Sequence, residues 1–248
     1  MKKHALFLVL LILSGCIKEP TEPVYDPEPN VGCLLSPDYK RQQVRVGKSW
    51  GIDEEDPEIW ISGADVKIGC AAETIAFHER SDKPGVYVSE SLLVESGQTY
   101  FLEVNYPDDN KVTGRTTVPQ KPRIITPADG DTVSPSQELR WESEGAAGFL
   151  LQYDTHEYGG GSANMLPEDL GHTTSITVDS LCIKYFGFPP DSIERITLRI
   201  WAADPNYYDY YFIRKYDEPM ETNIHLDGGL GVFGSFVVSD SITVFIKH

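Results

Sequence analysis

Short segments in which apolar and polar residues alternate recur along most of this chain. Residues 96–104 place Tyr100, Leu102 and Val104 on alternate positions, and residues 196–203 repeat this arrangement with a second apolar set. Side chains two residues apart share one face of a β-strand, so each segment predicts a strand with one buried face. Further strands are expected at residues 42–46, 60–61, 65–68, 74–77, 85–88, 124–126, 139–141, 148–153, 175–178 and 241–246. Since few segments sustain helical periodicity, we predict an all-β fold.

A proline-containing segment divides the predicted strands into two groups. Residues 119–122 read Pro-Gln-Lys-Pro, and proline lacks the amide donor that a central strand needs. A chain of 248 residues is long enough to hold two cores of ordinary size. We therefore expect two consecutive β-sandwich domains, at residues 31–119 and 120–248.

The first residues form a pattern of their own. Lys2 and Lys3 precede an apolar run from Ala5 to Leu13, which is too short to cross a bilayer core of about 30 Å. Small residues then lead into Cys16, an order that resembles the lipobox of bacterial lipoproteins. We predict a signal peptide at residues 1–15, and a lipidated Cys16 followed by a flexible, proline-rich tether through residue 30. The lipid on Cys16 would then hold the protein to a membrane.

Several short motifs carry resemblances to known families. Residues 61–66, 85–87, 97–104 and 116–119 resemble carboxypeptidase-regulatory or transthyretin-like domains. Residues 124–127, 129–132, 139–141 and 148–153 resemble the opening strands of fibronectin type III-like domains. Their order, together with the glycine-rich residues 228–235, resembles Bacteroidetes outer-membrane lipoproteins grouped as a domain of unknown function, DUF4249. That resemblance implies an outer-membrane location beside a transporter and brings no activity. The acidic residue of the Lys18–Glu19 pair resembles a surface-export signal, although the side of the membrane stays open.

The charge of the chain bears on its partners. The formal net charge is −17, and loss of Lys2 and Lys3 with the signal peptide would make it −19. Such a protein is repelled by phosphate backbones and anionic lipid surfaces, so we expect no nucleic-acid partner. Contact with the membrane is expected to go through the lipid on Cys16.

Three cysteines remain once Cys16 is lipidated. An odd number in an oxidising compartment indicates one disulfide and one free thiol. Cys33 and Cys70 fall in the first predicted domain, so we favour a disulfide between them, with Cys182 a buried apolar residue. The spacing of the cysteines and histidines does not fit zinc, and we predict no metal and no cofactor.

Catalytic motifs are missing from the sequence. The glycines of residues 228–234 lack the following helix that a phosphate-binding loop requires. His156 and Glu157 precede three glycines, which is typical of a solvated loop. Acidic residues 53–56, and the pair Asp129 and Asp131, leave calcium binding or a hydrolase carboxylate site open, although neither follows the spaced calcium loop. We predict that the protein is not an enzyme.

A tyrosine-rich segment is the candidate recognition surface. Residues 206–216 contain five tyrosines and one phenylalanine, and tyrosine offers both an apolar ring and a polar tip. Most of these side chains are expected in the core, with Tyr207, Tyr208 and Tyr211 exposed. The leading hypothesis is a non-enzymatic lipoprotein that binds or assembles an envelope complex, possible partners being an envelope protein or a glycan. The alternative is a surface carbohydrate-binding protein that uses these tyrosines.

Overall fold

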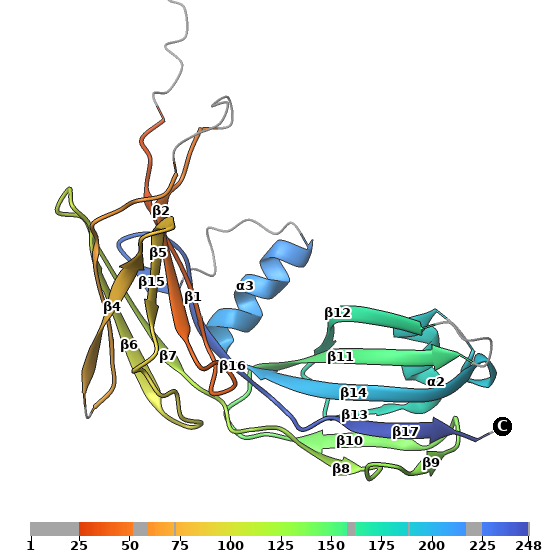
Figure 1. Ribbon diagram of the computed structural model, residues 1–248. Coiled ribbons are helices and arrows are strands. Elements are labelled where there is room, and N and C mark those ends of the chain that lie inside the picture. The colour runs from red at the N-terminus through yellow and green to blue at the C-terminus, as the bar shows by residue number, and fades with distance from the viewer. Residues whose placement is uncertain are drawn as a thin grey trace, which may run out of the picture.

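A computed structural model describes residues 25–51, 59–71, 73–157, 162–187, 189–216 and 225–247. The predicted signal peptide, Cys16, most of the tether and acidic residues 53–56 lie outside this range. The helices within it are too short or too polar to cross a bilayer. The chain forms two β-sandwich-like lobes side by side (Figure 1). The predicted all-β class is therefore confirmed.

The N-terminal sandwich is built from the first seven strands and a short strand from near the end of the chain. The strands are β1 (Pro29–Leu35), β2 (Gln42–Lys48), β3 (Asp65–Gly69), β4 (Thr74–Arg80), β5 (Lys83–Ser89), β6 (Thr99–Asn105), β7 (Lys111–Thr117) and β15 (Leu226–Asp227). They pair in the order β1-β2-β5-β4-β3-β6-β7-β15. Tyr100, Leu102 and Val104 point into the core, while Phe101 and Glu103 between them point outward. The alternation seen in the sequence thus sets the two faces of β6.

The C-terminal sandwich has a three-stranded sheet packed against a larger one. The small sheet pairs β8 (Arg123–Thr126), β10 (Glu138–Glu142) and β13 (Ser175–Thr177). The larger one contains β9 (Thr132–Val133), β11 (Gly148–Glu157), β12 (Ser162–Gly171), β14 (Ile193–Ala203) and β17 (Ile242–Ile246). The short helical segments α2 (Val178–Leu181), η1 (Cys182–Phe186) and η2 (Pro190–Ser192) connect β13 to β14.

One strand, β16 (Leu230–Val238), belongs to both sandwiches. Its first residues run parallel to β1, with Asn30 opposite Leu230 and Leu35 opposite Ser235. Its last residues pair antiparallel with the end of β14, where Trp201 lies opposite Val238. The expected division at residue 119 falls between β7 and β8, yet β15 and most of β16 return to the N-terminal sandwich. The two lobes therefore share a continuous path of hydrogen-bonded strands.

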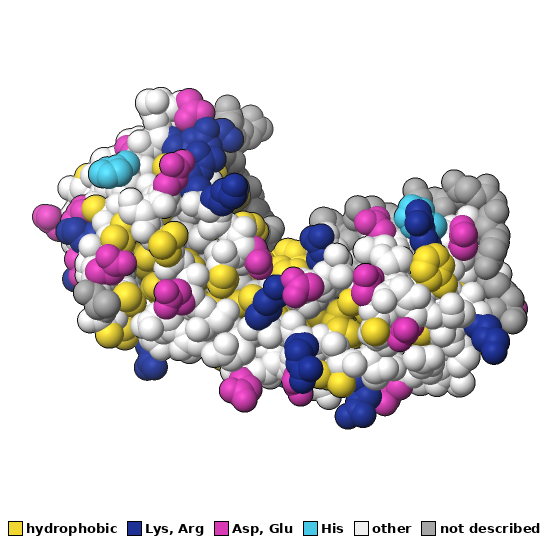
Figure 2. All heavy atoms as spheres, turned by 60° about the horizontal axis from the view of Figure 1, so that its bottom comes forward, with side chains coloured by type: hydrophobic (Ala, Val, Ile, Leu, Met, Phe, Trp, Pro, Cys, Tyr) yellow, Lys and Arg dark blue, Asp and Glu magenta, His cyan; other side chains and the backbone are white. Residues whose placement is uncertain are grey.

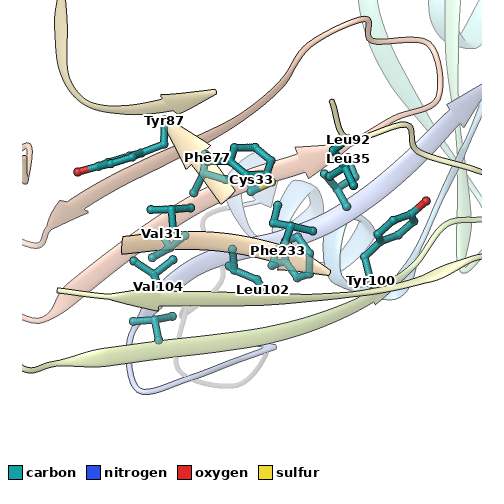
Figure 3. Packing of buried hydrophobic residues seen from close by; sticks show 14 of the residues in the cluster. Val31, Cys33, Leu35, Phe77, Tyr87, Leu92, Tyr100, Leu102, Val104 and Phe233 are labelled. Atoms are coloured by element: carbon teal, nitrogen blue, oxygen red, sulfur yellow. The ribbon is translucent and has the colours of Figure 1, made fainter. Parts of the chain in front are cut away.

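The core of the N-terminal sandwich also draws on both ends of the chain. Leu226, Phe233 and Val237 pack with the buried side chains of β1 to β7. Figure 3 shows the ring of Phe233 among Leu35, Tyr100 and Leu102. Phe233 is fully buried, so this core is incomplete without β16. The C-terminal sandwich has a separate core that includes Trp141, Phe149, Leu151, Ile196 and Leu198.

The cysteines are all free thiols in the described part of the chain, so the predicted Cys33–Cys70 disulfide is not formed. Cys33 lies at the centre of β1 and Cys70 directly follows β3, and three strands separate β1 from β3 in the sheet order. Burial raises the pKa of the Cys33 thiol, and burial together with Asp179 raises the pKa of Cys182 to about 12. Cys33 and Cys182 are therefore held as thiols in apolar surroundings.

Candidate functional site

A sharp corner joins the two sandwiches where β14 ends and helix α3 (Pro205–Tyr216) begins. The carboxylate of Asp204 accepts hydrogen bonds from Thr116 Oγ1 at 2.6 Å, Ser235 N at 2.8 Å and Tyr207 N at 2.9 Å. Asn206 Nδ2 donates to the carbonyl oxygens of Arg115 at 2.6 Å and Phe233 at 2.7 Å. These bonds tie β7, β14, β16 and the start of α3 into one junction.

Asp204 is almost completely buried at this junction, with 1% of its surface exposed. Burial raises the pKa of its carboxyl, and the hydrogen bonds from Thr116, Ser235 and Tyr207 oppose that rise. Its three donors and its position at a helix N-terminus fit a structural capping role. Its hydrogen-bonded, solvent-excluded position gives a substrate no route to it.

The predicted recognition tyrosines lie on α3, a helix that the all-β pattern of the sequence does not predict. Tyr208 is buried against Leu150 and Ala203, and its hydroxyl donates to Asp169 Oδ1 at 3.1 Å. Tyr211 donates to the carbonyl of Pro167 at 2.7 Å, and burial raises the pKa of Tyr207 to about 12. The expectation that all three are exposed is wrong, because i, i+3 and i, i+4 spacing on a helix points them at the C-terminal sandwich and β16. Their predicted binding role stays a prediction.

An open groove lies on the outer face of the N-terminal sandwich. We call it the sheet groove; it measures about 780 Å³ and is lined by β3, β6, β7, β15 and the start of α3. Phe101 sits on this face with 52% of its surface exposed, and its strand neighbour is Arg115. The Arg115 guanidinium carbon lies 6.0 Å from the centre of the Phe101 ring. An exposed aromatic ring with a cation beside it marks a surface suited to contact with another molecule.

Charged side chains of both signs surround Phe101. Lys111 Nζ lies 2.7 Å from Glu103 Oε2, and this hydrogen bond holds the pKa of Glu103 below its ordinary value. A hydrogen bond from Lys67 to Asp65 raises the pKa of Lys67. Glu103 and Lys67 are therefore ionised at neutral pH. The sheet groove thus combines an apolar centre with a charged border, as protein-binding surfaces do.

Asp129 and Asp131, which the sequence offers as possible calcium ligands, form hydrogen bonds with the backbone. Asp129 Oδ1 accepts from Thr243 N at 2.7 Å, and Asp131 Oδ2 accepts from Ala128 N at 2.8 Å. Among the described residues, histidine, cysteine and carboxylate side chains form no cluster able to hold a metal ion. Asp131 closes the turn between β8 and β9, and Asp129 ties that turn to β17.

Sequence reasoning placed Phe101 in a strand but did not single out its outward position. The signal was present, because Phe101 falls between Tyr100 and Leu102 in the alternating pattern and so must face away from their core. Asn206 and β15 also line this groove, but no local sequence pattern predicts it. Their place there depends on the pairing of β15 with β7, which joins distant parts of the chain.

Comparisons with known proteins give a family but no activity. A family model described as domain of unknown function (DUF4249) matches residues 19–242. The crystal structure of Dpr11 IG1 bound to DIP-gamma IG+IG2 is 8% identical, covers 90% of this chain and 100% of its own, and has a TM-score of 0.23. That of DIP-gamma IG1+IG2 is 10% identical, covers 90% and 99%, and has a TM-score of 0.21. Scores this low carry no argument about function. No curated protein matches the sequence.

Proposed function

We propose that this chain, which belongs to the DUF4249 family of domains of unknown function, is a lipid-anchored binding or assembly component of a bacterial envelope complex. The observation that carries the proposal is the sheet groove. Phe101 lies in the middle of paired strands, so its ring is held out to solvent by a rigid backbone. A partner can bury that ring without ordering a flexible segment, which lowers the entropic cost of binding.

The membrane anchor rests on the sequence pattern before and at Cys16. After removal of the signal peptide, the tether that follows the lipidated Cys16 would join the lipid to β1. Chain extension of roughly 3.5 Å per residue lets such a tether hold the sandwiches a few nanometres from the bilayer. We place the protein at the outer membrane, with a transporter as its neighbour. We further propose that the N-terminal sandwich is a carboxypeptidase-regulatory or transthyretin-like domain and the C-terminal one a fibronectin type III-like domain.

The two alternative functions have less support. Carbohydrate binding through Tyr207, Tyr208 and Tyr211 would need rings that here contact the C-terminal sandwich and β16. A hydrolase would need two carboxylates converging in a pocket. Glu103 and Asp227 line the sheet groove, but Glu103 is already bound to Lys111.

Affinity capture tests the proposed function. The tagged, lipidated protein is captured from its native envelope under mild detergent and compared with Cys16→Ala and Phe101→Ser by mass spectrometry. Phe245→Ser is the matched control, since Phe245 is also an outward strand residue, 39% exposed, on β17 of the other sandwich. We expect one envelope protein to be recovered with the native chain and Phe245→Ser, and to be lost with Phe101→Ser and Cys16→Ala. Equal recovery with Phe101→Ser would contradict the role of the groove.

A further inference from the structure

A second groove lies where the two sandwiches meet, and it shares none of its described lining residues with the sheet groove. We call it the junction groove; it measures about 480 Å³, and the residues that define it here are Tyr39, Gln152, Arg199, Trp201 and Phe236. Tyr39 comes from the connection between β1 and β2, whereas Gln152 lies on β11, Arg199 and Trp201 on β14, and Phe236 on β16. Figure 2 shows hydrophobic side chains in the hollow between the lobes. Small-molecule sites occur preferentially at such interfaces.

Three aromatic rings form one wall of the junction groove. Trp201 stacks on Phe236 with ring centres 4.6 Å apart and an angle of 12° between the planes. Tyr39 meets Phe236 edge-on at 5.6 Å. Phe236 is 2% exposed, whereas Tyr39 is 48% exposed. The buried Phe236 ring therefore holds the rings of Tyr39 and Trp201, which pack on it, in place. A fixed aromatic surface of this kind can cover the flat C–H face of a sugar ring.

Polar groups stand beside these rings on the same outer face of the sheet. Gln152 and Arg199 are opposite each other on β11 and β14. Trp201 Nε1 donates to Gln152 Oε1 at 3.2 Å, which turns the amide nitrogen of Gln152 to serve as a donor. Arg199 forms no ion pair within the part of the chain that the structure describes. Both side chains can therefore donate hydrogen bonds to hydroxyl groups of a ligand.

The charges that line the junction groove cancel. Arg199 and Lys121 are balanced by Asp38 and Asp240, and Lys121 Nζ lies 2.6 Å from Asp240 Oδ1. Asp38 Oδ2 accepts from Val238 N at 3.1 Å, so that carboxylate is held at the groove. A polyanion would also meet the net charge of −17 on the whole chain. The balance favours an uncharged ligand with many hydroxyl groups.

We propose that the junction groove binds a neutral saccharide unit. Trp201 covers its C–H face, Tyr39, whose ring stands at 83° to Phe236, contacts its edge, and Gln152, Arg199 and Asp38 bind its hydroxyl groups. None of the described α3 tyrosines lines this groove, although Tyr207 packs against its Phe236 ring. The groove shares no described lining residue with the sheet groove, so the proposal stands or falls independently of the proposed function.

Calorimetric titration tests the proposal. The full lipidated chain is held in a zwitterionic detergent, because alkyl maltosides carry a sugar headgroup that would compete. The probes are neutral gluco-, manno-, xylo- and galacto-oligosaccharides of four to six units, with a phenylalanine-containing hexapeptide as the competing ligand class. Tyr39→Ala and Arg199→Ala test the groove. Tyr25→Ala is the matched control, because Tyr25 is equally exposed, at 46%, and lies outside the groove.

We expect at least one oligosaccharide to bind, with the affinity weakened about tenfold or more by Tyr39→Ala and by Arg199→Ala and unchanged by Tyr25→Ala. Trp201 gives a second readout, since saccharide binding beside it should change tryptophan fluorescence in the native chain. The proposal is overturned if no oligosaccharide binds, if only the hexapeptide binds, or if Tyr39→Ala and Tyr25→Ala have the same effect.

Discussion

At the residue scale, the side chain of Asp204 connects three elements at the junction of the sandwiches. One carboxylate accepts from β7, β16 and the first turn of α3 while almost no water reaches it. A buried carboxylate is stable only when such donors compensate for its lost hydration. Asp204 therefore links β7, β16 and α3 at the junction of the two sandwiches.

Removal of the Asp204 carboxylate should destabilise the whole protein. Asp204→Ala leaves Ser235 N, Tyr207 N and the Thr116 hydroxyl buried without this acceptor, and we expect a loss of about 3 kcal/mol in unfolding free energy. Asp191→Ala is the control, because Asp191 is an exposed residue of η2, and a change within about 0.5 kcal/mol is expected there. Urea denaturation measures both. Equal effects of the two substitutions would contradict the account of the junction.

The raised pKa of Asp204 predicts a pH dependence with a definite sign. Because burial raises this pKa in the folded state, the folded protein holds a proton at Asp204 over a pH range where the unfolded chain has released it. The stabilisation that comes from protonated Asp204 is complete below the pKa of Asp204 in the unfolded chain. It is lost as pH rises through the pKa of Asp204 in the folded protein. We therefore compare the unfolding free energy of the native chain with that of Asp204→Asn. We expect the native value minus the Asp204→Asn value to decrease as pH rises through this range. Urea denaturation at a series of pH values measures this difference. A difference that increases with pH would contradict a raised pKa of Asp204 in the folded state.

At the scale of elements, α3 is held to the C-terminal sandwich by close contact between a ring and a backbone. A Cβ atom added to Gly148 on β11 would overlap the ring of Tyr208. That ring cannot move freely, since its hydroxyl is bonded to Asp169 and its face packs on Leu150. The absence of a side chain at Gly148 therefore lets α3 dock against β11.

Gly148→Ala should consequently lower the thermal unfolding midpoint by several degrees, an effect typical of overpacking by about 1–3 kcal/mol. Gly32→Ala on β1 is the matched control, because a Cβ there would meet nothing within 4 Å. Adding Tyr208→Ala to Gly148→Ala should remove the overlap, so the double variant should be less destabilised than the sum of the two single variants. Strict additivity of the two changes would argue against the contact.

The elements that could be predicted from sequence are those whose pattern is local. Alternation around Tyr100 and Leu102 gave the correct strand and the correct buried face, and residues 196–203 gave β14. The helix α3 was missed because closely spaced tyrosines also fit a strand. The pairing of β16 with β1 was missed because it joins residues about 200 positions apart, and the run of buried residues in β16 does not specify a partner.

At the scale of the whole molecule, β16 makes the two sandwiches interdependent. Residues 25–119 alone lack Phe233, Leu226 and Val237, which complete their core. We expect this fragment to lack a cooperative unfolding transition by circular dichroism, since it leaves an open core and an unpaired edge of β1. Joining residues 225–238 to it through a glycine–serine linker should restore the transition. A fragment of residues 25–119 that unfolds as cooperatively as the linked chain would contradict this dependence.

The sheet groove and the anchor are also connected at this scale. The groove lies on the sandwich that the proposed tether would join, and β15 of the C-terminal part of the chain forms part of its border. With the proposed flexible tether, Phe101 can reach a neighbour in the membrane within the span of that tether. We propose that this neighbour is a specific envelope protein.

Photo-crosslinking in intact cells tests that claim most directly. A photoreactive phenylalanine analogue replaces Phe101 in one strain and Phe245 in another, and adducts are identified after irradiation. We predict one envelope protein crosslinked from position 101 and none from position 245. No adduct from position 101, or the same adducts from both positions, would contradict the account.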